Sequence, residues 1–454
     1  MLIAALLLVS CNTENETLNL LEEPEKWRSD NPLVIEEGEL TLEGEYETFV
    51  YQPGLFKTFE NFELTAEIMS SPDAQVALLF HTNPRDLKKG YEVIIENSEV
   101  GNWDRLLKTG SLTSVRNIYY NMVKPDTWFE LNIKVQENHI TVFVNGFPVV
   151  DYIEPEMPFR PSQIENRRLG SGTFAFKTLF GNTAVKIRKL NVTPLPSANK
   201  KQNSNPEFVR NITQLHYRQI PVVDYHVHKK GDLTLKQLIE KSAKSGINYG
   251  IAANCGLKFP IQSDEDLKAY YETLDGLPVF KAMQAEGREW VEMFSKDLVN
   301  QFDYAFTDAM TWTNSRNVRM RLWIPEETDV GDPEDFMEQL VAQIEKVVTE
   351  PIAIYVNPTF LPVEIADRYE ELWTDERINR VVMALKKNNV ALEIGNRYQL
   401  PGDRVIAAAR EAGVNFAMGT NNTGPDNLEN LEWALQTVER FNLQPSEMFL
   451  PKQK

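Results

Sequence analysis

Hydrophobic and polar residues alternate with a period of two from about Trp27 to Pro194, with clear runs at 62–68, 75–80, 90–95, 128–135 and 140–144. Alternation of this kind places successive side chains on opposite faces of a strand. Turn sequences such as Asn145-Gly146 separate the runs. Many short strands joined by turns predict an antiparallel β-sandwich, a jelly roll, over residues 27–196.

The pattern changes after residues 194–206, a polar stretch without periodicity that we interpret as part of a linker over 197–219. From Ile220 onward, strand-like runs alternate with helical ones. The expected strands are 222–225, 249–253, 279–284, 304–307, 352–356, 390–394 and 414–418, and the expected helices include 234–245, 333–350, 376–388 and 403–412. Seven β-then-α units predict a parallel sheet covered by helices, and closure would leave no exposed edge. We therefore expect an α/β barrel of the TIM type, with seven strands, over residues 220–454.

The first ten residues, MLIAALLLVS, are apolar and uncharged. They are too short to span a bilayer as a mature helix and are typical of the hydrophobic core of a secretion signal. The alternative is a short buried segment. Residues 8–11 resemble a bacterial lipobox, which implies cleavage before Cys11 and lipidation of its thiol. Residues 11–26 would then be a tether, and the protein would be anchored by lipid in the bacterial cell envelope, facing the periplasm or the cell surface.

Acidic residues outnumber basic ones, 66 to 47, so the formal net charge is -19. An acidic chain without a basic run is a poor binder of nucleic acid, and we expect no nucleic-acid partner. The chain has two cysteines. If Cys11 carries lipid, Cys255 has no partner for an intrachain disulfide, and we expect it to be a buried, inert thiol.

Two histidines, His226 and His228, stand at the end of the first expected barrel strand, with Asp224 two residues earlier. Alternate residues of a strand face the same way, so both imidazoles would point together and supply half of a metal site. The alternative is that they are ordinary polar residues at a strand end. The later strands end near Asn254, Glu286, Asp308, Asn357, Glu393, Asn421 and Asn422. Because a barrel gathers the carboxyl ends of its strands at one face, we expect these groups to share a pocket.

The run Asp224–His228 at the head of such a series resembles the opening of the polymerase-and-histidinol-phosphatase (PHP) superfamily of metal-dependent hydrolases, over about residues 220–451. The resemblance implies a distorted seven-stranded barrel and metal ligands at His226, His228 and Glu286. Where that family usually has further His or Asp ligands, this chain has Asn254, Asn357 and Asn421-Asn422. Amides are weaker ligands, so the resemblance implies at most one divalent ion, Zn, Mn or Fe. A barrel that has lost its metal is the alternative, and no nucleotide cofactor is expected.

The first half of the chain has its own resemblance, to the 3-keto-disaccharide hydrolase domain, whose fold is a concanavalin-type jelly roll. The motifs that carry it are Phe62-Glu-Leu64, Lys89–Ile95, Trp128–Ile133 and Val144–Phe147. The resemblance implies a role for Glu92 at a sugar site. Trp103 is a second candidate for a sugar-binding face, with a surface loop residue as the alternative.

These patterns favour an exported, carbohydrate-active hydrolase or lyase acting on a glycoside, with a 3-keto-glycoside as one candidate. Glu393 and Asp308 are the candidates for general acid and base, beside a metal on His226, His228 and Glu286. The candidate substrate-binding residues are Asn254, Asn357, Asn396, Arg397, Asn421, Asn422, Glu92 and Trp103. A glycan-binding surface lipoprotein without catalysis and a PHP-type phosphoesterase are the alternatives. The expected partners are a carbohydrate and, through Cys11, a membrane.

Overall fold

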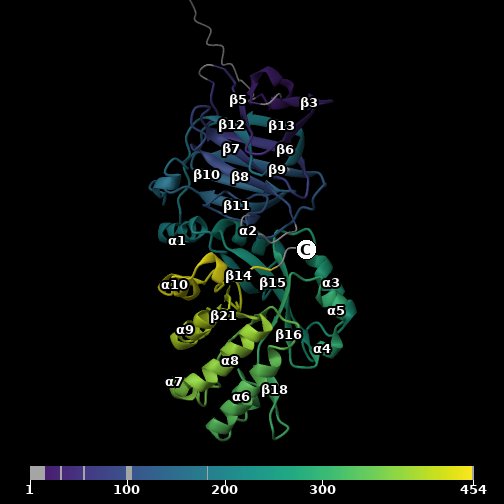
Figure 1. The fold of residues 1–454 in the computed structure, drawn as a ribbon, viewed down its shortest axis with the longest axis vertical. Coiled ribbons are helices and arrows are strands. Elements are labelled where there is room, and N and C mark those ends of the chain that lie inside the picture. Colours follow the sequence, from purple (N-terminus) through teal and green to yellow (C-terminus); the bar gives the residue numbers. More distant parts are fainter. Residues whose placement is uncertain (1–15, 31–32, 55–56, 99–104, 181–182, 452–454) are drawn as a thin grey trace, which may run out of the picture. The chain divides into compact units, whose positions relative to one another are not determined.

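The computed structural model describes residues 16–30, 33–54, 57–98, 105–180 and 183–451, so the predictions for Cys11 and Trp103 lie outside the described residues. The chain forms two compact units, shown in Figure 1. The first unit combines the residues up to Val93 with Asp126–Gly146 and Ile153–Ser204. The second combines Ile94–Pro125, Phe147–Tyr152 and the chain from Asn205 onward. In the parts of the chain that are described, no helix is both long and apolar enough to cross a membrane.

Two antiparallel sheets build the first unit, as the period-two pattern predicts. One runs in the order β10-β9-β6-β13-β4-β3, with β1 beside β13, and the other in the order β2-β5-β12-β7-β8. The strands are β1 (Leu18–Asn19), β2 (Trp27–Arg28), β3 (Val34–Glu36), β4 (Glu39–Glu43), β5 (Thr48–Tyr51), β6 (Phe62–Ser70), β7 (Gln75–Thr82), β8 (Tyr91–Glu96), β9 (Phe129–Gln136), β10 (His139–Val144), β12 (Thr173–Thr178) and β13 (Ala184–Pro194). Alternate residues of β6 are buried, so its sheet has one core-facing side. The jelly-roll-like prediction is confirmed at this level.

The segment 18–26, predicted as part of a tether, is folded instead. Strand β1 pairs with β13, and two short 3₁₀ turns follow, η1 (Leu20–Glu22) and η2 (Pro24–Lys26). Leu20 and Leu21 are buried, and the indole nitrogen of Trp27 donates to the Leu20 carbonyl at 2.9 Å. These apolar residues attach the segment to the sandwich because burying them removes their surface from water.

A closed barrel of seven strands forms the centre of the second unit, in the order β14-β15-β16-β17-β20-β21-β22, with parallel pairing throughout. This confirms the predicted seven strands. The strands are β14 (Val223–His228), β15 (Asn248–Gly256), β16 (Phe280–Glu286), β17 (Tyr304–Thr307), β20 (Ile354–Tyr355), β21 (Ala391–Gly395) and β22 (Phe416–Gly419). A hairpin of β18 (Thr311–Thr313) and β19 (Arg319–Arg321) follows β17, and β11 (Phe147–Ile153) precedes the barrel in the chain.

Helices follow most of the barrel strands. They are α2 (Leu235–Ser245), α3 (Asp264–Leu274), α4 (Trp290–Met293), α5 (Lys296–Val299), α6 (Pro333–Val347), α7 (Tyr369–Leu372), α8 (Asp375–Asn388), α9 (Asp403–Ala412) and α10 (Glu432–Arg440), with 3₁₀ turns elsewhere at η4 (Ser162–Ile164), η5 (Pro325–Glu327), η6 (Ala366–Arg368) and η7 (Pro445–Glu447). Figure 1 shows α6, α8 and α9 side by side, and α8 contacts both neighbours. The helix α2 starts with a capping box at Thr234 and ends at Gly246 in the left-handed conformation, which explains its bounds.

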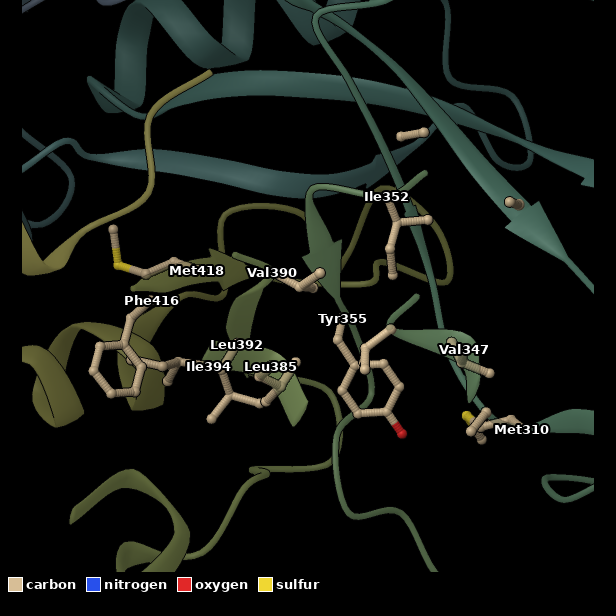
Figure 2. Close-up of a cluster of buried hydrophobic side chains, with 14 of the residues drawn as sticks. Met310, Val347, Ile352, Tyr355, Leu385, Val390, Leu392, Ile394, Phe416 and Met418 are labelled. Carbon is tan, nitrogen blue, oxygen red and sulfur yellow. The ribbon is translucent and has the colours of Figure 1, made fainter. Parts of the chain in front are cut away.

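The core of the second unit lies between the barrel wall and these helices. Figure 2 shows part of it, with Leu392 and Ile394 of β21, Phe416 of β22 and Leu385 of α8 grouped together. All four are fully buried. The residues between them in β21 and β22, Glu393 and Ala417, therefore point to the interior of the barrel, because successive side chains of a strand alternate. The same alternation directs the polar side chains at the strand ends toward the interior of the barrel.

The helix α1 (Pro206–Tyr217) occupies most of the segment predicted as a linker. Its first turn carries standard start signals: the Asn205 side chain accepts from the backbone N–H of Phe208, and Pro206 occupies the first helical position. Ile212 and Leu215 are buried in the core of the second unit. The linker prediction is therefore wrong for these residues.

Residues 94–125 also differ from the prediction, which placed them in the sandwich. They belong to the second unit, where Tyr119 donates from its hydroxyl to the Ile220 carbonyl at 3.0 Å. The side chain of Asn248 accepts from Tyr119 N–H at 3.0 Å and donates to the Asn117 carbonyl at 2.9 Å. Most of this segment has no period-two pattern, and the run at 90–95 carries no information on which core the residues after it join.

Candidate active site

A polar cavity of about 270 Å³ opens at the carboxyl ends of the barrel strands. Six strand-end side chains predicted to converge do so here, although 193 positions separate the first from the last. They are His228, Asn254, Glu286, Asp308, Asn357 and Asn421. The rest of the lining is Lys230, Phe259, Pro260, Gln284, Met310, Trp323, Arg397 and Tyr398. The barrel geometry thus produces one site from residues scattered along the chain.

The two histidines of β14 share a face, as predicted, with ring centroids 5.1 Å apart. They occupy different depths. His226 is fully buried, with Nδ1 2.6 Å from Glu393 Oε1 and Nε2 3.3 Å from Gln284 Oε1. Neither His226 nor Glu393 is among the side chains that line the cavity. The structure therefore places Glu393, our candidate acid or base, beneath the site, where it also accepts from the backbone N–H of Asn357 at 2.7 Å.

Space for this His226–Glu393 pair depends on Gly419 at the end of β22. A Cβ added at Gly419 would lie 2.2 Å from Glu393 Oε1 and 2.8 Å from the Cβ of His226. Both distances are far below van der Waals contact, so a side chain here would displace the pair. The neighbouring residue, Thr420, fixes the start of β14: its N–H and hydroxyl donate to Asp224 at 2.9 and 2.6 Å. Asp224 is thereby a buried anchor rather than a ligand, and burial raises its pKa.

Glu286 and Asp308 are two buried carboxyls in the cavity wall. Burial and, secondarily, the negative charge of Asp308 raise the pKa of Glu286 to about 8. Burial also raises the pKa of Asp308. Asp308 accepts two hydrogen bonds, from Met310 N–H and from the amide of Asn357, both at 2.9 Å, whereas Glu286 accepts one, from Asn254 at 2.7 Å. Because hydrogen bonds to a carboxylate favour its charged form, Asp308 holds the charge of the pair and Glu286 holds the proton near neutral pH.

A chain of side-chain amides connects Asp308 to a cation across the cavity. Arg397 donates to Asn421 Oδ1 at 3.4 Å, Asn421 Nδ2 donates to Asn357 Oδ1 at 2.9 Å, and Asn357 Nδ2 donates to Asp308 Oδ2 at 2.9 Å. Asn357 and Asn421 both have positive φ, 46° and 45°. Asparagine tolerates the left-handed region better than most residues, so at these two positions it satisfies both the backbone and the hydrogen-bond chain.

Two cations, Lys230 and Arg397, face the same cavity. Within the described ranges neither forms an ion pair with a carboxylate. The Arg397 guanidinium lies 5.1 Å from the centroid of the Tyr398 ring. Burial lowers the pKa of Lys230, and the positive charge of Arg397 lowers it further. The arginines of the β18–β19 hairpin behave differently: Arg319 pairs with Glu289, and Arg321 with Glu327.

The predicted metal ligands do not form a ligand set as placed. Both ring nitrogens of His226 already face oxygens of Glu393 and Gln284, and Nδ1 of His228 lies 3.1 Å from the Ala252 carbonyl. Only Nε2 of His228 is left for the cavity. Over the described residues, no group of three or more His, Cys, Asp or Glu side chains could hold a metal ion. The divalent ion therefore stays a prediction.

Several other predicted residues have structural partners. Asn422 accepts from His228 N–H at 2.7 Å and donates to its carbonyl at 3.0 Å, so it holds β14 in place. Asn396 accepts from the N–H groups of Trp433 and Ala434 and caps the first turn of α10. Cys255 is buried, as expected, and burial raises its pKa. In the first unit, Glu92 pairs with Arg167.

A second, larger cavity of about 530 Å³ shares Arg397 with the first. Its lining is mostly amides with one indole: Asn396, Arg397, Gln399, Thr420, Asn427, Asn430, Glu432, Trp433 and Gln436. Such a lining offers hydroxyl-binding groups and one aromatic face. Arg397, which donates to the first amide of the hydrogen-bond chain, therefore lines both cavities.

Sequence reasoning missed Lys230 and Gln284, although a signal for both was present. Lys230 continues the two-residue spacing of His226 and His228, and Gln284 stands two residues before Glu286. Following the alternation two residues past His228 and two residues back from Glu286 would have found them. The aromatic members of the lining, Phe259, Trp323 and Tyr398, lie in loops without periodic pattern.

The family model and the solved structures compared below each cover less than half of the chain. Residues 17–193 match the family described as the 3-keto-alpha-glucoside-1,2-lyase-like domain. A candidate glycosyl hydrolase from Parabacteroides distasonis ATCC 8503 is 19% identical, covering 40% of this chain and 100% of that one, with a TM-score of 0.34. A carbohydrate-binding module from Bacillus subtilis is 10% identical, covering 37% of this chain and 95% of its own, with a TM-score of 0.27. No curated protein matches the chain.

Proposed function

We propose that this protein is a carbohydrate-active enzyme and that the barrel cavity cleaves a glycoside by acid–base chemistry. The observation that carries the proposal is the pair of buried carboxyls, Glu286 and Asp308, in one wall of an open polar cavity. Two carboxyls with different hydrogen-bond environments are suited to separate roles as acid and base. The family matched by residues 17–193 supports a sugar as the substrate.

The cavity side chains suit β-elimination from a 3-keto-glycoside. The ketone acidifies the C2 proton, which the Asp308 carboxylate removes, leaving an enolate whose charge the side-chain amides of the cavity stabilise by hydrogen bonding. The enolate then returns its electron pair to form the C1–C2 double bond as the C1–O bond breaks. Glu286 donates its proton to the leaving oxygen. Asp308 ends protonated and Glu286 ionised, and exchange with water restores both.

The second cavity would take the next sugar ring. It shares Arg397 with the first, and Trp433 provides an aromatic face beside the amides of Asn430 and Gln399. An indole beside amides matches a sugar, which has an apolar face and a rim of hydroxyls. The jelly-roll-like first unit would engage the same glycan. Export, lipidation of Cys11 and attachment to the cell envelope belong to this proposal, and loss of fatty-acid labelling in the Cys11→Ser variant would test them.

The test is turnover by the purified chain of a 3-keto-glycoside compared with its parent glycoside. Glu286→Gln and Asp308→Asn should each lower kcat by about 100-fold or more, the usual loss for a missing general acid or base. Glu289→Gln, an acid of the same segment that pairs with Arg319 outside the cavity, is the matched control and should retain activity. The proposal fails if both cavity variants retain wild-type turnover.

Other outcomes of the same assay support a different function. Loss of activity in Glu92→Gln alone would place the chemistry in the first unit. Tight sugar binding without turnover would indicate a glycan-binding protein, and turnover of an aryl phosphate with added manganese would indicate a phosphoesterase. Each of these results overturns the acid–base assignment of the barrel cavity.

A further inference from the structure

Two positive side chains face the barrel cavity, and among the described residues neither forms an ion pair with a carboxylate. Lys230 is half-buried, and in the described parts of the chain neither it nor Arg397 lies within ion-pairing distance of an acid. The formal charge of the protein is -19, and Arg288, two residues after Glu286, pairs with Glu350 at 2.8 Å. Placing two like charges close together costs free energy unless a ligand of opposite charge compensates them.

Lys230 and Arg397 line the same cavity as the carboxyl groups of Glu286 and Asp308. A ligand carboxylate would compensate the two cations. A phosphate dianion would carry more negative charge into a cavity that already holds two carboxyl groups, and it would be repelled more strongly.

We propose that Lys230 and Arg397 form a carboxylate subsite, so that the glycoside taken by the barrel cavity carries an acidic sugar. The forked guanidinium of Arg397 matches a planar carboxylate with two parallel hydrogen bonds, and Lys230 adds a point charge. Tyr398, whose ring lies near the guanidinium, restricts its orientation. This inference names the substrate class of the proposed function and therefore rests on it, but binding alone can test it.

The experiment is calorimetric titration of the full chain with methyl glucuronide, methyl glucoside and glucose 6-phosphate. Methyl glucuronide should bind about tenfold more tightly than methyl glucoside, and added salt should weaken its binding. Lys230→Met and Arg397→Met should each remove most of that preference. Lys229→Met, which deletes the same charge from the exposed neighbouring residue, is the matched control and should leave binding unchanged.

Three results would overturn the inference: equal affinity for glucuronide and glucoside, equal behaviour of Lys230→Met and Lys229→Met, or tighter binding of the phosphate. The Glu286→Gln variant separates this inference from the catalytic proposal. If it binds glucuronide normally, and the wild-type chain turns over no glycoside, the carboxylate subsite stands while the proposed activity fails. If the wild-type chain cleaves neutral glycosides and Lys230→Met binds glucuronide and glucoside with the same affinities as wild type, the activity stands while the subsite fails.

Discussion

The state of Glu286 can be tested by stability measurements that need no substrate. An ordinary glutamate ionises near pH 4.5, but burial and the charge of Asp308 raise the pKa of Glu286 to about 8 in the folded barrel. Between those two pH values the unfolded chain has released a proton that the folded chain retains. The contribution of this group to stability is therefore complete in acid and is lost as the pH rises toward 8.

The size of the effect follows from the same shift. From about pH 5.5 to about pH 8.5, full linkage would cost wild type about 3 kcal/mol, and sharing of the proton with Asp308 reduces this to roughly 1.5 kcal/mol. Glu286→Gln cannot ionise and escapes the loss. Relative to wild type, the variant should therefore gain roughly 3–6 °C in the Tm of the barrel between these pH values.

The assay is differential scanning calorimetry of both chains at the two pH values, with EDTA present so that no cation neutralises the carboxyl. Buried acids and histidines other than Glu286 and Asp308 titrate in both chains, and their contributions cancel in the comparison. Glu289→Gln is the control: its carboxylate pairs with Arg319, which helps to lower its pKa, so it is ionised across the whole range and its effect should not change with pH. A Tm difference between wild type and Glu286→Gln that is the same at both pH values would refute the reasoning.

Three further predictions concern residues beneath and beside the cavity. Gly419→Ala should destabilise the barrel by about 2 kcal/mol or more because its Cβ would overlap the buried His–Glu pair; in chemical denaturation Gly424→Ala, which meets no atom within 4 Å, should be neutral. Thr420→Val should cost about 1–3 kcal/mol by leaving buried Asp224 without its hydroxyl donor, measurable by the same denaturation; near-neutral behaviour would contradict this. Cys255 should resist iodoacetamide in the native chain and react only after unfolding, as followed by mass spectrometry, because burial raises its pKa; rapid native alkylation would contradict its burial.

Strand periodicity predicted much of the fold and the place of the site. The alternation at His226 and His228 was enough to place both imidazoles on one face, and the seven β-then-α units were enough for a barrel that gathers the strand ends. The strand pattern could not predict which of the strand-end side chains line the cavity and which lie beneath it. Glu393 and Asp308 occupy equivalent places in the sequence pattern, yet one lies beneath the cavity and the other lines it.

The remaining differences have physical causes that no single-strand pattern contains. The sequence contains helix start signals for α1 at Asn205 and Pro206. The polar segment before them favoured a linker, so the helix was not predicted. The roles of Asn422 and Asn396 as backbone anchors depend on partners far away in the chain, His228 and the first turn of α10. The pKa of Glu286 depends on how deeply the folded chain buries its carboxyl group, which residue spacing does not predict.

The asparagines that stand at the cavity mouth have one more consequence. An imidazole gains or loses a proton between about pH 5 and pH 8 and reverses the direction of its hydrogen bonds as it does so, but a carboxamide does neither. The relay from Arg397 through Asn421 and Asn357 therefore keeps a single polarity across physiological conditions. A ligand hydroxyl that binds to this relay would therefore meet the same donors and acceptors in acidic and in alkaline surroundings, whatever the charge of the neighbouring carboxyls.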